Sequence, residues 1–213
     1  MQVQKAALLS TAYFGPIQYY AKFLAHETRI IEIHDHYTRQ TYRNRCNIYG
    51  SNGILSLSIP VLKGPGHKSL VRDIRMDDTK KWKKLHWKGI ESAYMHSPFF
   101  EFYMDEIQYF FIKDYKFLLD LNTDILRTIL PQLEIDAEFT YTDEFVSNAG
   151  DHTVDYRELI HPKVGLSADP YFTPRPYPQV FSPKLGFLPN LSILDLLFNE
   201  GPNSRAILEK TIA

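Results

Sequence analysis

The chain has 213 residues, a formal net charge of −1, 44% hydrophobic residues and 23% charged residues. These values are typical of a soluble globular protein with a core of ordinary size, and they exclude a general electrostatic attraction to nucleic acid or to an anionic membrane. The single cysteine excludes an intrachain disulfide and favours a reducing compartment, so we expect a cytoplasmic protein.

The first part of the chain predicts short strands with one helix between them. Residues 6–9 are a short apolar run, 18–25 have helical character, and 29–34 (RIIEIH) predict a second strand. In 54–60 (ILSLSIP) apolar residues alternate with serines, which predicts a strand with one apolar face.

The middle of the chain changes from strand to helix periodicity. The Gly- and Pro-rich stretch at 63–69 (KGPGHKS) predicts a loop, and 70–76 predict a further short strand. Three helices follow. The first spans 79–94, the second begins after Ser97, which we expect to cap it, and the third spans 117–130.

The last third is less regular. Residues 137–142 (AEFTYT) alternate and predict a strand, whereas 146–189 are rich in proline and show little periodicity. A long irregular stretch of this kind is typical of a functional loop, a disordered segment or an overlooked element. Asn190 is then expected to cap a helix at 191–199, and a short helix at 204–212 ends the chain.

This order of elements predicts an α/β fold formed by residues 1–213 as a single domain of two or three layers. We expect a small mixed sheet, a central helical stretch and a C-terminal helix that closes on the sheet, with an irregular Pro-rich segment at about 146–189. No window reaches the roughly twenty apolar residues of a membrane-spanning helix, so we expect no membrane span.

The stretch HYTRQTYRNRCNIYG (36–50) is the strongest candidate for a ligand site. It contains Arg39, Arg43 and Arg45 among three tyrosines. The guanidinium fork matches a carboxylate or phosphate, and phenol rings add hydroxyl donors and flat walls. The alternative is that the arginines are solvated or paired with nearby carboxylates. We predict that one arginine pairs inside the protein and that the others face a ligand cleft.

The acidic and histidine-rich segment before it suggests acid–base chemistry. Glu32 and His36 are the candidate proton acceptors. A metal held by Glu32, His34 and His36 is the alternative, but no second cluster with suitable spacing follows, and we predict neither a metal nor a cofactor. The basic stretch TKKWKKLHWK (79–88) is read as a solvated helix, so no nucleic-acid partner is expected.

Asp195 lies inside the apolar pattern of the predicted helix at 191–199. A buried carboxylate needs a partner. The sequence therefore predicts a structural contact between Asp195 and one of the arginines of 36–50, which would join the two ends of the chain.

Five segments carry a family resemblance over nearly the whole length: AYFGPIQYYAKF (12–23), YTRQTYRNRCNI (37–48), LSIPV (57–61), HWKGIESAYMHSPFFEFY (86–103) and YPQVFSPKLGFLPNLSILDLLFNEGP (177–202). The most specific pattern falls on Tyr37, Arg39, Tyr42, Asn44, Arg45 and Ile48. The chain resembles the WbqC-like protein family, in particular the shorter branch seen in Bacteroidetes.

The resemblance implies a role in surface polysaccharide biosynthesis, including O-antigen, because the family is associated with those gene clusters. It implies a transferase that moves an acyl or aminoacyl group from an activated donor to a sugar or sugar nucleotide. His36 and Glu32 would be catalytic. A small-molecule anion or the activated sugar or acyl donor would contact Tyr13, Tyr37, Arg39, Tyr42, Asn44, Arg45, Tyr177 and Gln179. The alternative is a noncatalytic protein that binds an anion or sugar nucleotide without turnover.

Overall fold

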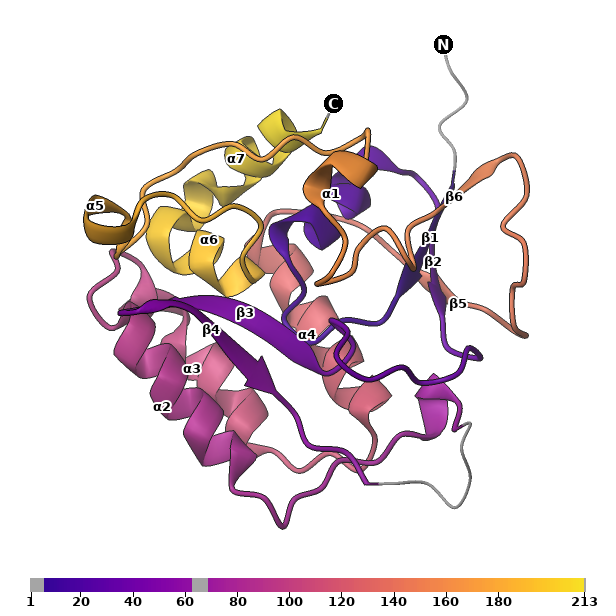
Figure 1. Cartoon of the computed structure of the whole chain (residues 1–213), viewed down its shortest axis with the longest axis horizontal. Helices are drawn as coiled ribbons and strands as arrows, with labels where there is room; N and C mark the ends of the chain where they lie inside the picture. The colour runs from indigo at the N-terminus through magenta and orange to yellow at the C-terminus, as the bar shows by residue number, and fades with distance from the viewer. Residues whose placement is uncertain (1–5, 63–68, 213) are drawn as a thin grey trace.

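A parallel sheet forms one half of the molecule in the computed structural model, which describes residues 6–62 and 69–212 (Figure 1). Its strands are β1 (Ala6–Ser10), β2 (Arg29–Glu32), β5 (Thr140–Tyr141) and β6 (Thr153–Asp155), in the order β5-β2-β1-β6. The central strand β1 is buried at Ala7, Leu8 and Leu9. An unbroken apolar run of this kind is typical of a parallel strand that is covered on both faces.

The helix α1 (Ile17–Ala25) connects β1 to β2, which pair in parallel. Asn190 stabilises the start of this helix, because its Oδ1 accepts a hydrogen bond of 2.8 Å from the backbone N–H of Gln18. The prediction that Asn190 caps the later helix is therefore wrong. That helix, α6 (Ile193–Glu200), begins after Ser192, whose Oγ accepts from the N–H of Leu194.

A separate antiparallel hairpin consists of β3 (Arg45–Gly50) and β4 (Gly53–Ser58). Its turn, Ser51-Asn52, precedes Gly53, whose φ of 108° favours glycine. The predicted α/β class is confirmed, and its parallel and antiparallel pairings fall in two sheets rather than one. The sequence did not predict β3, because its polar residues mask the alternation of Cys46 and Ile48.

Three longer helices carry much of the core: α2 (Trp82–Tyr94) and α3 (Phe100–Ile112) supply aromatic side chains, and α4 (Leu118–Gln132) supplies leucine and isoleucine. Figure 1 shows α2 and α3 side by side below the hairpin and α4 nearer the parallel sheet. Ser97 does not cap α3, because its Oγ donates to the carbonyl of Tyr94. Pro131 lies in the last turn of α4, where it removes one N–H donor from the helix close to its end.

The Pro-rich stretch at 146–189 contains the strand β6, a 3-10 turn η2 (Leu166–Ala168) and the short helix α5 (Ser182–Leu185). It is fixed to α1 by a buried ion pair in which Lys22 Nζ lies 2.6 Å from Asp169 Oδ2. The strand β6 is the element that the sequence pattern did not reveal, and it completes the parallel sheet.

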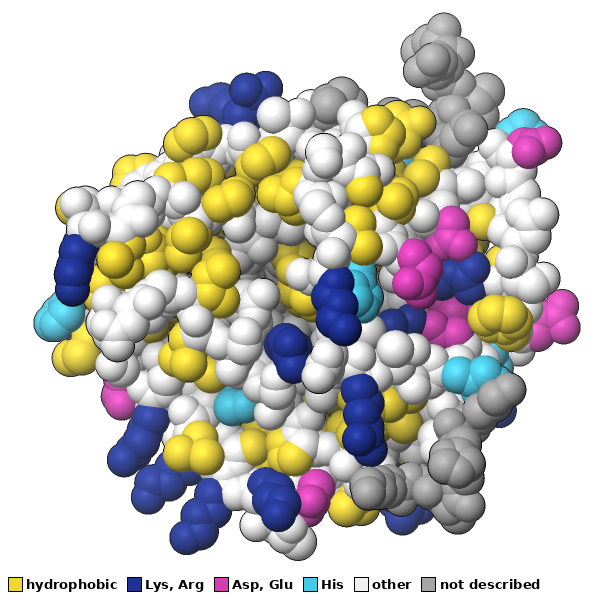
Figure 2. All heavy atoms as spheres, in the orientation of Figure 1, with side chains coloured by type: hydrophobic (Ala, Val, Ile, Leu, Met, Phe, Trp, Pro, Cys, Tyr) yellow, Lys and Arg dark blue, Asp and Glu magenta, His cyan; other side chains and the backbone are white. Residues whose placement is uncertain are grey.

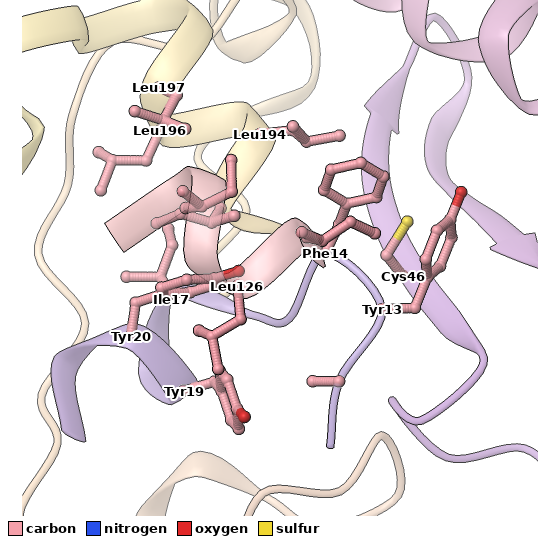
Figure 3. Close-up of a cluster of buried hydrophobic side chains, with 14 of the residues drawn as sticks. Tyr13, Phe14, Ile17, Tyr19, Tyr20, Cys46, Leu126, Leu194, Leu196 and Leu197 are labelled. Carbon is pink, nitrogen blue, oxygen red and sulfur yellow. The ribbon is translucent and has the colours of Figure 1, made fainter. Parts of the chain in front are cut away.

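The C-terminal part consists of α6, the 3-10 turn η3 (Gly201–Asn203) and α7 (Ser204–Thr211). In Figure 3, Leu194, Leu196 and Leu197 of α6 lie near Phe14, within a core that also includes side chains of α1 and α4. The predicted C-terminal helix is confirmed, and α6 contacts β3 of the antiparallel hairpin.

Two further predictions concern the segment between β4 and α2. The strand predicted at 70–76 is wrong: the chain forms a 3-10 turn, η1 (Val71–Asp73), flanked by isolated bridges to His36, Val61 and Phe117. The loop predicted at 63–69 lies, apart from Ser69, outside the described residues. Within the described ranges, no helix is both long and apolar enough to cross a membrane.

Candidate functional site

All four parallel strands end at the same edge of the sheet. The chain passes from β1 to β2 on one side, and β6 returns on the other side of β1. The strand order therefore reverses between β1 and β6, and in open α/β sheets this reversal at the carboxyl ends is where ligands bind. Figure 2 shows acidic and basic side chains side by side at the right of the molecule, on the side where Figure 1 places the parallel sheet.

A narrow cleft opens at this position. Its enclosed part has about 10 Å³ of space, and the empty space is about 280 Å³ when the open solvent at its mouth is included. Its walls come from the end of β1, from the loop before β3 and from the segment after β6. The lining residues are Leu9, Ser10, Thr11, Ala12, Tyr19, Thr41, Tyr42, Arg43, Tyr156, Arg157 and Ile160.

Three buried polar atoms of this lining have no hydrogen-bond partner among the described residues. They are Ser10 Oγ, the Tyr19 hydroxyl and Arg43 Nε. A buried polar group without a partner costs about 1–3 kcal/mol, so native proteins pair nearly all of them. Three of the nine buried unpaired side-chain atoms among the described residues thus lie on one cleft, where a ligand or water would supply the missing bonds.

Arg43 is the central cation of the cleft. Arg43 is only 4% exposed, and its Nη2 forms an ion pair with Asp35 Oδ2. The backbone carbonyl of Arg43 accepts a hydrogen bond of 2.8 Å from Asn122 Nδ2. The ion pair holds the guanidinium and the Asn122 bond holds the backbone of Arg43, while Nε is left without a partner among the described residues. An arginine side chain remains charged at any physiological pH, so this is a permanent positive charge at the cleft wall.

Asp35, the partner of Arg43, has a second oxygen, Oδ1, that is buried and unpaired among the described residues. Burial raises the pKa of this carboxyl above its usual range, against the opposing effects of the charge and hydrogen bond of Arg43. The carboxylate therefore holds a proton more readily than an exposed aspartate does.

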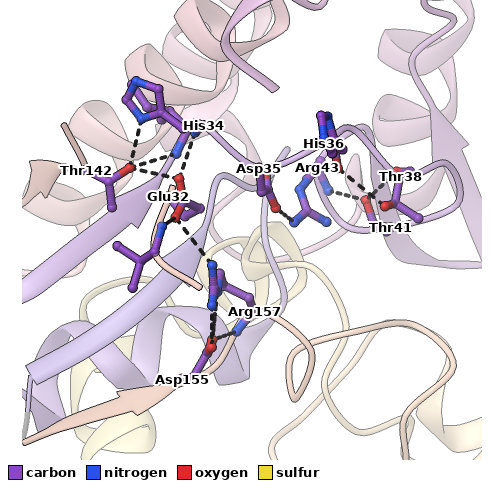
Figure 4. Close-up of polar contacts among 12 residues, drawn as sticks. Glu32, His34, Asp35, His36, Thr38, Thr41, Arg43, Thr142, Asp155 and Arg157 are labelled. Atoms are coloured by element: carbon purple, nitrogen blue, oxygen red, sulfur yellow. Dashed lines mark hydrogen bonds and ion pairs between the residues drawn. The ribbon is translucent and has the colours of Figure 1, made fainter. Parts of the chain in front are cut away.

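Arg157 is the second cation of the lining. Its Nη2 donates a hydrogen bond of 2.6 Å to Asp155 Oδ2, and its Nε donates one of 3.0 Å to Asp155 Oδ1. On the other side, its Nη1 lies 3.3 Å from Glu32 Oε2. Hydrogen bonding to Asp155 raises the pKa of Arg157. Figure 4 shows the guanidinium placed between these two carboxylates. It is thus held in one orientation at the end of β6.

Glu32 is fully buried, and both of its oxygens are engaged (Figure 4). Oε1 accepts from the N–H of His34 at 2.7 Å and from the Thr142 hydroxyl at 2.9 Å. Oε2 accepts from the N–H of Val146 at 2.9 Å and from Arg157. This geometry is that of a group that positions its neighbours, and it leaves no free lone pair for the predicted proton transfer.

The structure separates the three arginines of 36–50. Arg43 both pairs inside the protein and lines the cleft, whereas Arg39 is exposed. Arg45 lies on the hairpin, where its Nε donates 3.0 Å to Ser58 Oγ. His36 is exposed too and does not line the cleft, so its catalytic role is a prediction without geometric support.

The predicted tyrosine and amide ligands are also dispersed. Only Tyr42 lines the cleft. Tyr37 is half-buried, and burial raises its pKa to about 12, while its hydroxyl has no partner among the described residues. The Tyr13 hydroxyl bonds His86 Nδ1 in the core. Asn44 Nδ2 donates to the carbonyl of Ile59, which fixes the start of the hairpin.

The predicted contact between Asp195 and an arginine is wrong. Asp195 Oδ1 accepts 2.9 Å from the Tyr94 hydroxyl, and Oδ2 accepts 2.6 Å from the Tyr177 hydroxyl and 2.8 Å from Gln179 Nε2. Uncharged donors thus satisfy this carboxylate. Tyr177 and Gln179, predicted as ligand residues, are engaged in this buried network.

Sequence reasoning missed Ser10, Tyr19, Asp155 and Arg157. The signal for Ser10 was its position directly after a buried apolar strand, where parallel sheets place ligand groups. Arg157 follows a strand of only three residues inside the Pro-rich stretch, so no periodicity marks it. Among the described residues, no three metal-ligating side chains are grouped closely enough to hold a metal ion.

Comparisons with known proteins agree with the resemblance in the sequence. The model of the WbqC-like protein family matches residues 11–174 and 146–207. A Mycobacterium tuberculosis (strain ATCC 25618 / H37Rv) protein described as "Uncharacterized protein Rv1507c" is 28% identical over 225 residues, covering 93% of this chain and 95% of the relative. No solved structure matches the chain. The chain belongs to the WbqC-like protein family.

Proposed function

We propose that this protein is a transferase that moves an acyl or aminoacyl group from an activated donor to a sugar or sugar nucleotide in surface polysaccharide biosynthesis. The anionic part of the donor binds at the cleft between β1 and β6. The family name points to polysaccharide-related biosynthesis, and the proposal adds a location and a set of residues to it.

The observation that carries the proposal is the set of unpaired buried atoms at the cleft: Arg43 Nε, Ser10 Oγ and the Tyr19 hydroxyl. A guanidinium N–H and hydroxyl donors are the groups that bind phosphate or carboxylate oxygens. The ion pair with Asp35 keeps Arg43 in place before a ligand arrives, so little ordering is needed on binding.

In the transfer step, the bond between the acyl carbon and its leaving group breaks, and a bond forms from that carbon to a hydroxyl or amine of the acceptor. The leaving group departs as an anion beside Arg43. The proton of the acceptor passes to Asp35, which does not itself line the cleft but contacts the lining residue Arg43, and whose unpaired Oδ1 and raised pKa suit a proton acceptor. Asp35 takes this role in place of His36 and Glu32.

The second candidate function is binding without turnover. It is favoured by the state of the two predicted bases, because His36 is exposed and Glu32 is fully hydrogen-bonded. In that case the same cleft binds the anion, but no proton acceptor acts on a second substrate.

A melting-temperature screen tests the proposal. Sugar nucleotides, acyl-coenzyme A and aminoacyl donors are each added to the wild-type protein, to Arg43→Lys and to the exposed control Arg39→Lys. A ligand that binds the folded state raises the melting temperature in proportion to the logarithm of its concentration over Kd. We expect one class to stabilise the wild type and Arg39→Lys but not Arg43→Lys.

The stabilising class is then incubated with sugar acceptors, and the acceptor mass is measured. A gain of the acyl or aminoacyl mass that is lost in Asp35→Asn supports the transferase. Stabilisation without any mass change supports the noncatalytic alternative. Stabilisation that persists in Arg43→Lys but disappears in Arg39→Lys would overturn the cleft as the site.

A further inference from the structure

The hairpin has one covered edge and one open edge. On β3, the outward-facing Tyr49 N–H donates 3.1 Å to the Tyr94 hydroxyl, and the Asn47 carbonyl accepts 2.8 Å from the N–H of Ser192. On β4, the structure gives no partner to the outward-facing backbone groups of Ile54 and Ser56 among the described residues. An open edge is a template for another strand.

The register of the hairpin identifies which groups point outward. Gly50 and Gly53 close a two-residue turn, and hydrogen-bonded and non-hydrogen-bonded pairs alternate from there. The pairs Tyr49–Ile54, Asn47–Ser56 and Arg45–Ser58 are non-hydrogen-bonded, which agrees with the outward bonds of Tyr49 and Asn47. The N–H and C=O groups of Ile54, Ser56 and Ser58 therefore face away from β3.

Between Ile54 and Ser56 this edge lacks the usual protection against strand pairing, whereas His86 of α2 covers the Ser58 carbonyl. Natural edge strands are commonly protected by lysine, proline, a bulge or a covering segment. The strand β4, GILSLS, contains no charged residue and no proline. Ile54 is 59% exposed and Leu55 is 40% exposed, although both belong to an apolar strand.

An apolar strip continues from the edge onto α2. Leu55 and Leu57 lie against Gly89, where an added Cβ would approach their methyl groups at 3.5 Å and 3.4 Å. One turn earlier, Leu85 is 66% exposed. A strand added beside β4 would place its own inward-facing side chains over Leu55 and Leu85 and remove both from water.

We propose that β4 pairs antiparallel with β4 of a second copy of this chain, which makes a four-stranded sheet across a two-fold axis. The edge is its own complement: Ser56 lies opposite Ser56 of the second copy, and Ile54 lies opposite Ser58. Leu55 then packs beside Leu57 of the second copy. No charged side chain meets a like charge along this pairing, and an isologous contact of this kind closes as a dimer.

The Ser58 carbonyl already accepts a hydrogen bond from His86. A carbonyl has two lone pairs, so it can accept from Ile54 of the second copy as well. The dimer places the β1–β6 clefts outside the contact, because none of their lining residues belongs to the hairpin strands. The inference is therefore independent of the proposed transfer reaction.

Sedimentation velocity of the full chain, from low-micromolar to near-millimolar concentration, tests this pairing with charge variants at its centre. The wild type is expected to sediment as a dimer, and Ser56→Lys and Ser56→Glu as monomers, because each would place like charges opposite each other. An equimolar mixture of the two variants is expected to restore a dimer. Ser147→Lys, an exposed serine far from the hairpin, is the matched control and should remain a dimer.

Three results would overturn the proposal: a wild type that is monomeric at every concentration, a Ser56→Lys variant that remains dimeric, or a mixture that remains monomeric. Circular dichroism establishes that the variants fold. Hydrogen exchange of the unaltered protein gives a second readout, since the amides of Ile54 and Ser56 should exchange more slowly as concentration rises. Exchange rates that do not change with concentration would count against the pairing.

Discussion

Two buried polar networks in this protein differ in one respect. Around Asp195, both carboxylate oxygens and the hydroxyls of Tyr94 and Tyr177 are hydrogen-bonded. At the β1–β6 cleft, Arg43 and Asp35 pair with each other, yet each keeps a buried atom without a partner. The closed network stabilises the fold, and the open network has capacity for a ligand. Complete hydrogen bonding is therefore the property that separates the structural carboxylate of Asp195 from Arg43, the arginine proposed to bind the ligand.

The largest effect should come from opening the closed network. Replacing Asp195 with Ala leaves two phenols and the Gln179 amide without their acceptor in the core, and we expect the free energy of unfolding to fall by about 3–5 kcal/mol. Urea denaturation measures the change. A loss below 1 kcal/mol would show that Asp195 does not stabilise the fold, and the contrast between the networks would fail.

Arg43→Lys should act on binding rather than on folding. Lysine keeps the positive charge beside Asp35 but lacks the Nε–H and the planar fork, so the affinity for the stabilising ligand should fall by roughly 30- to 100-fold, or about 2–3 kcal/mol. Calorimetric titration against wild type measures the loss. Equal affinities in the two proteins would place the ligand elsewhere.

Glu32→Gln tests whether Glu32 acts by holding Arg157. The substitution keeps the side-chain volume but removes the charge beside Arg157 Nη1. Because Asp155 still holds the other side of the guanidinium, we expect a loss of affinity of about tenfold, or roughly 1.4 kcal/mol, rather than complete loss. Abolished turnover with unchanged affinity would instead indicate that Glu32 takes part in proton transfer.

The pH dependence of stability gives a smaller effect that reports on Asp195 alone. Burial raises the pKa of Asp195, and the hydrogen bonds from Tyr177, Tyr94 and Gln179 only partly oppose it. The folded state therefore binds this proton more tightly than the unfolded state, so the contribution of Asp195 to stability decreases as pH rises through the raised pKa.

The comparison is made with Asp195→Asn, which cannot titrate. The unfolding free energy of wild type minus that of the variant should decrease as pH rises from the ordinary aspartate value of about 4 to the raised value. Urea titrations across this range measure the difference. An increase with pH would mean that the folded state prefers the ionised carboxylate.

The smallest effects should come from the exposed residues of 36–50. Arg39→Ala and His36→Ala remove side chains that lie in solvent, and each should change stability by less than about 0.5 kcal/mol. Neither should change affinity at the cleft. A large loss of binding in either variant would restore the exposed loop as the ligand site.

The sequence predicted the fold better than the site. Apolar runs and helical periodicity located β1, β2, β4 and the long helices, because burial of one face repeats along the chain. The strand β6 was missed because three residues are too few to show a period. Because β6 was not predicted, the neighbouring carboxyl ends of β1 and β6, where Arg157 lies, could not be recognised from the sequence.

The candidate site could be predicted only in part for a related physical reason. The motif around Arg43 predicted an anion site, and this stays a prediction; the three arginines are equivalent in sequence but differ in burial. Tyr19 carries no local signal of function, and the position of Ser10 after a buried strand indicates only the edge of a sheet. Their unpaired atoms become visible only when distant segments pack around them. The partners of Asp195 come from two separate segments, α2 and residues 177–179, so charge alone suggested an arginine.

The central claim is that Arg43 Nε is the open donor of a ligand cleft, and NMR of arginine side-chain Nε–H groups tests it most directly. The spectrum of the wild type is recorded during titration with each compound that stabilises it in the melting screen. The account predicts that the Arg43 Nε–H signal shifts with saturation, while the signals of Arg39 and Arg45 do not move. Shifts of Arg39 or Arg45 with an unmoved Arg43 signal would contradict it.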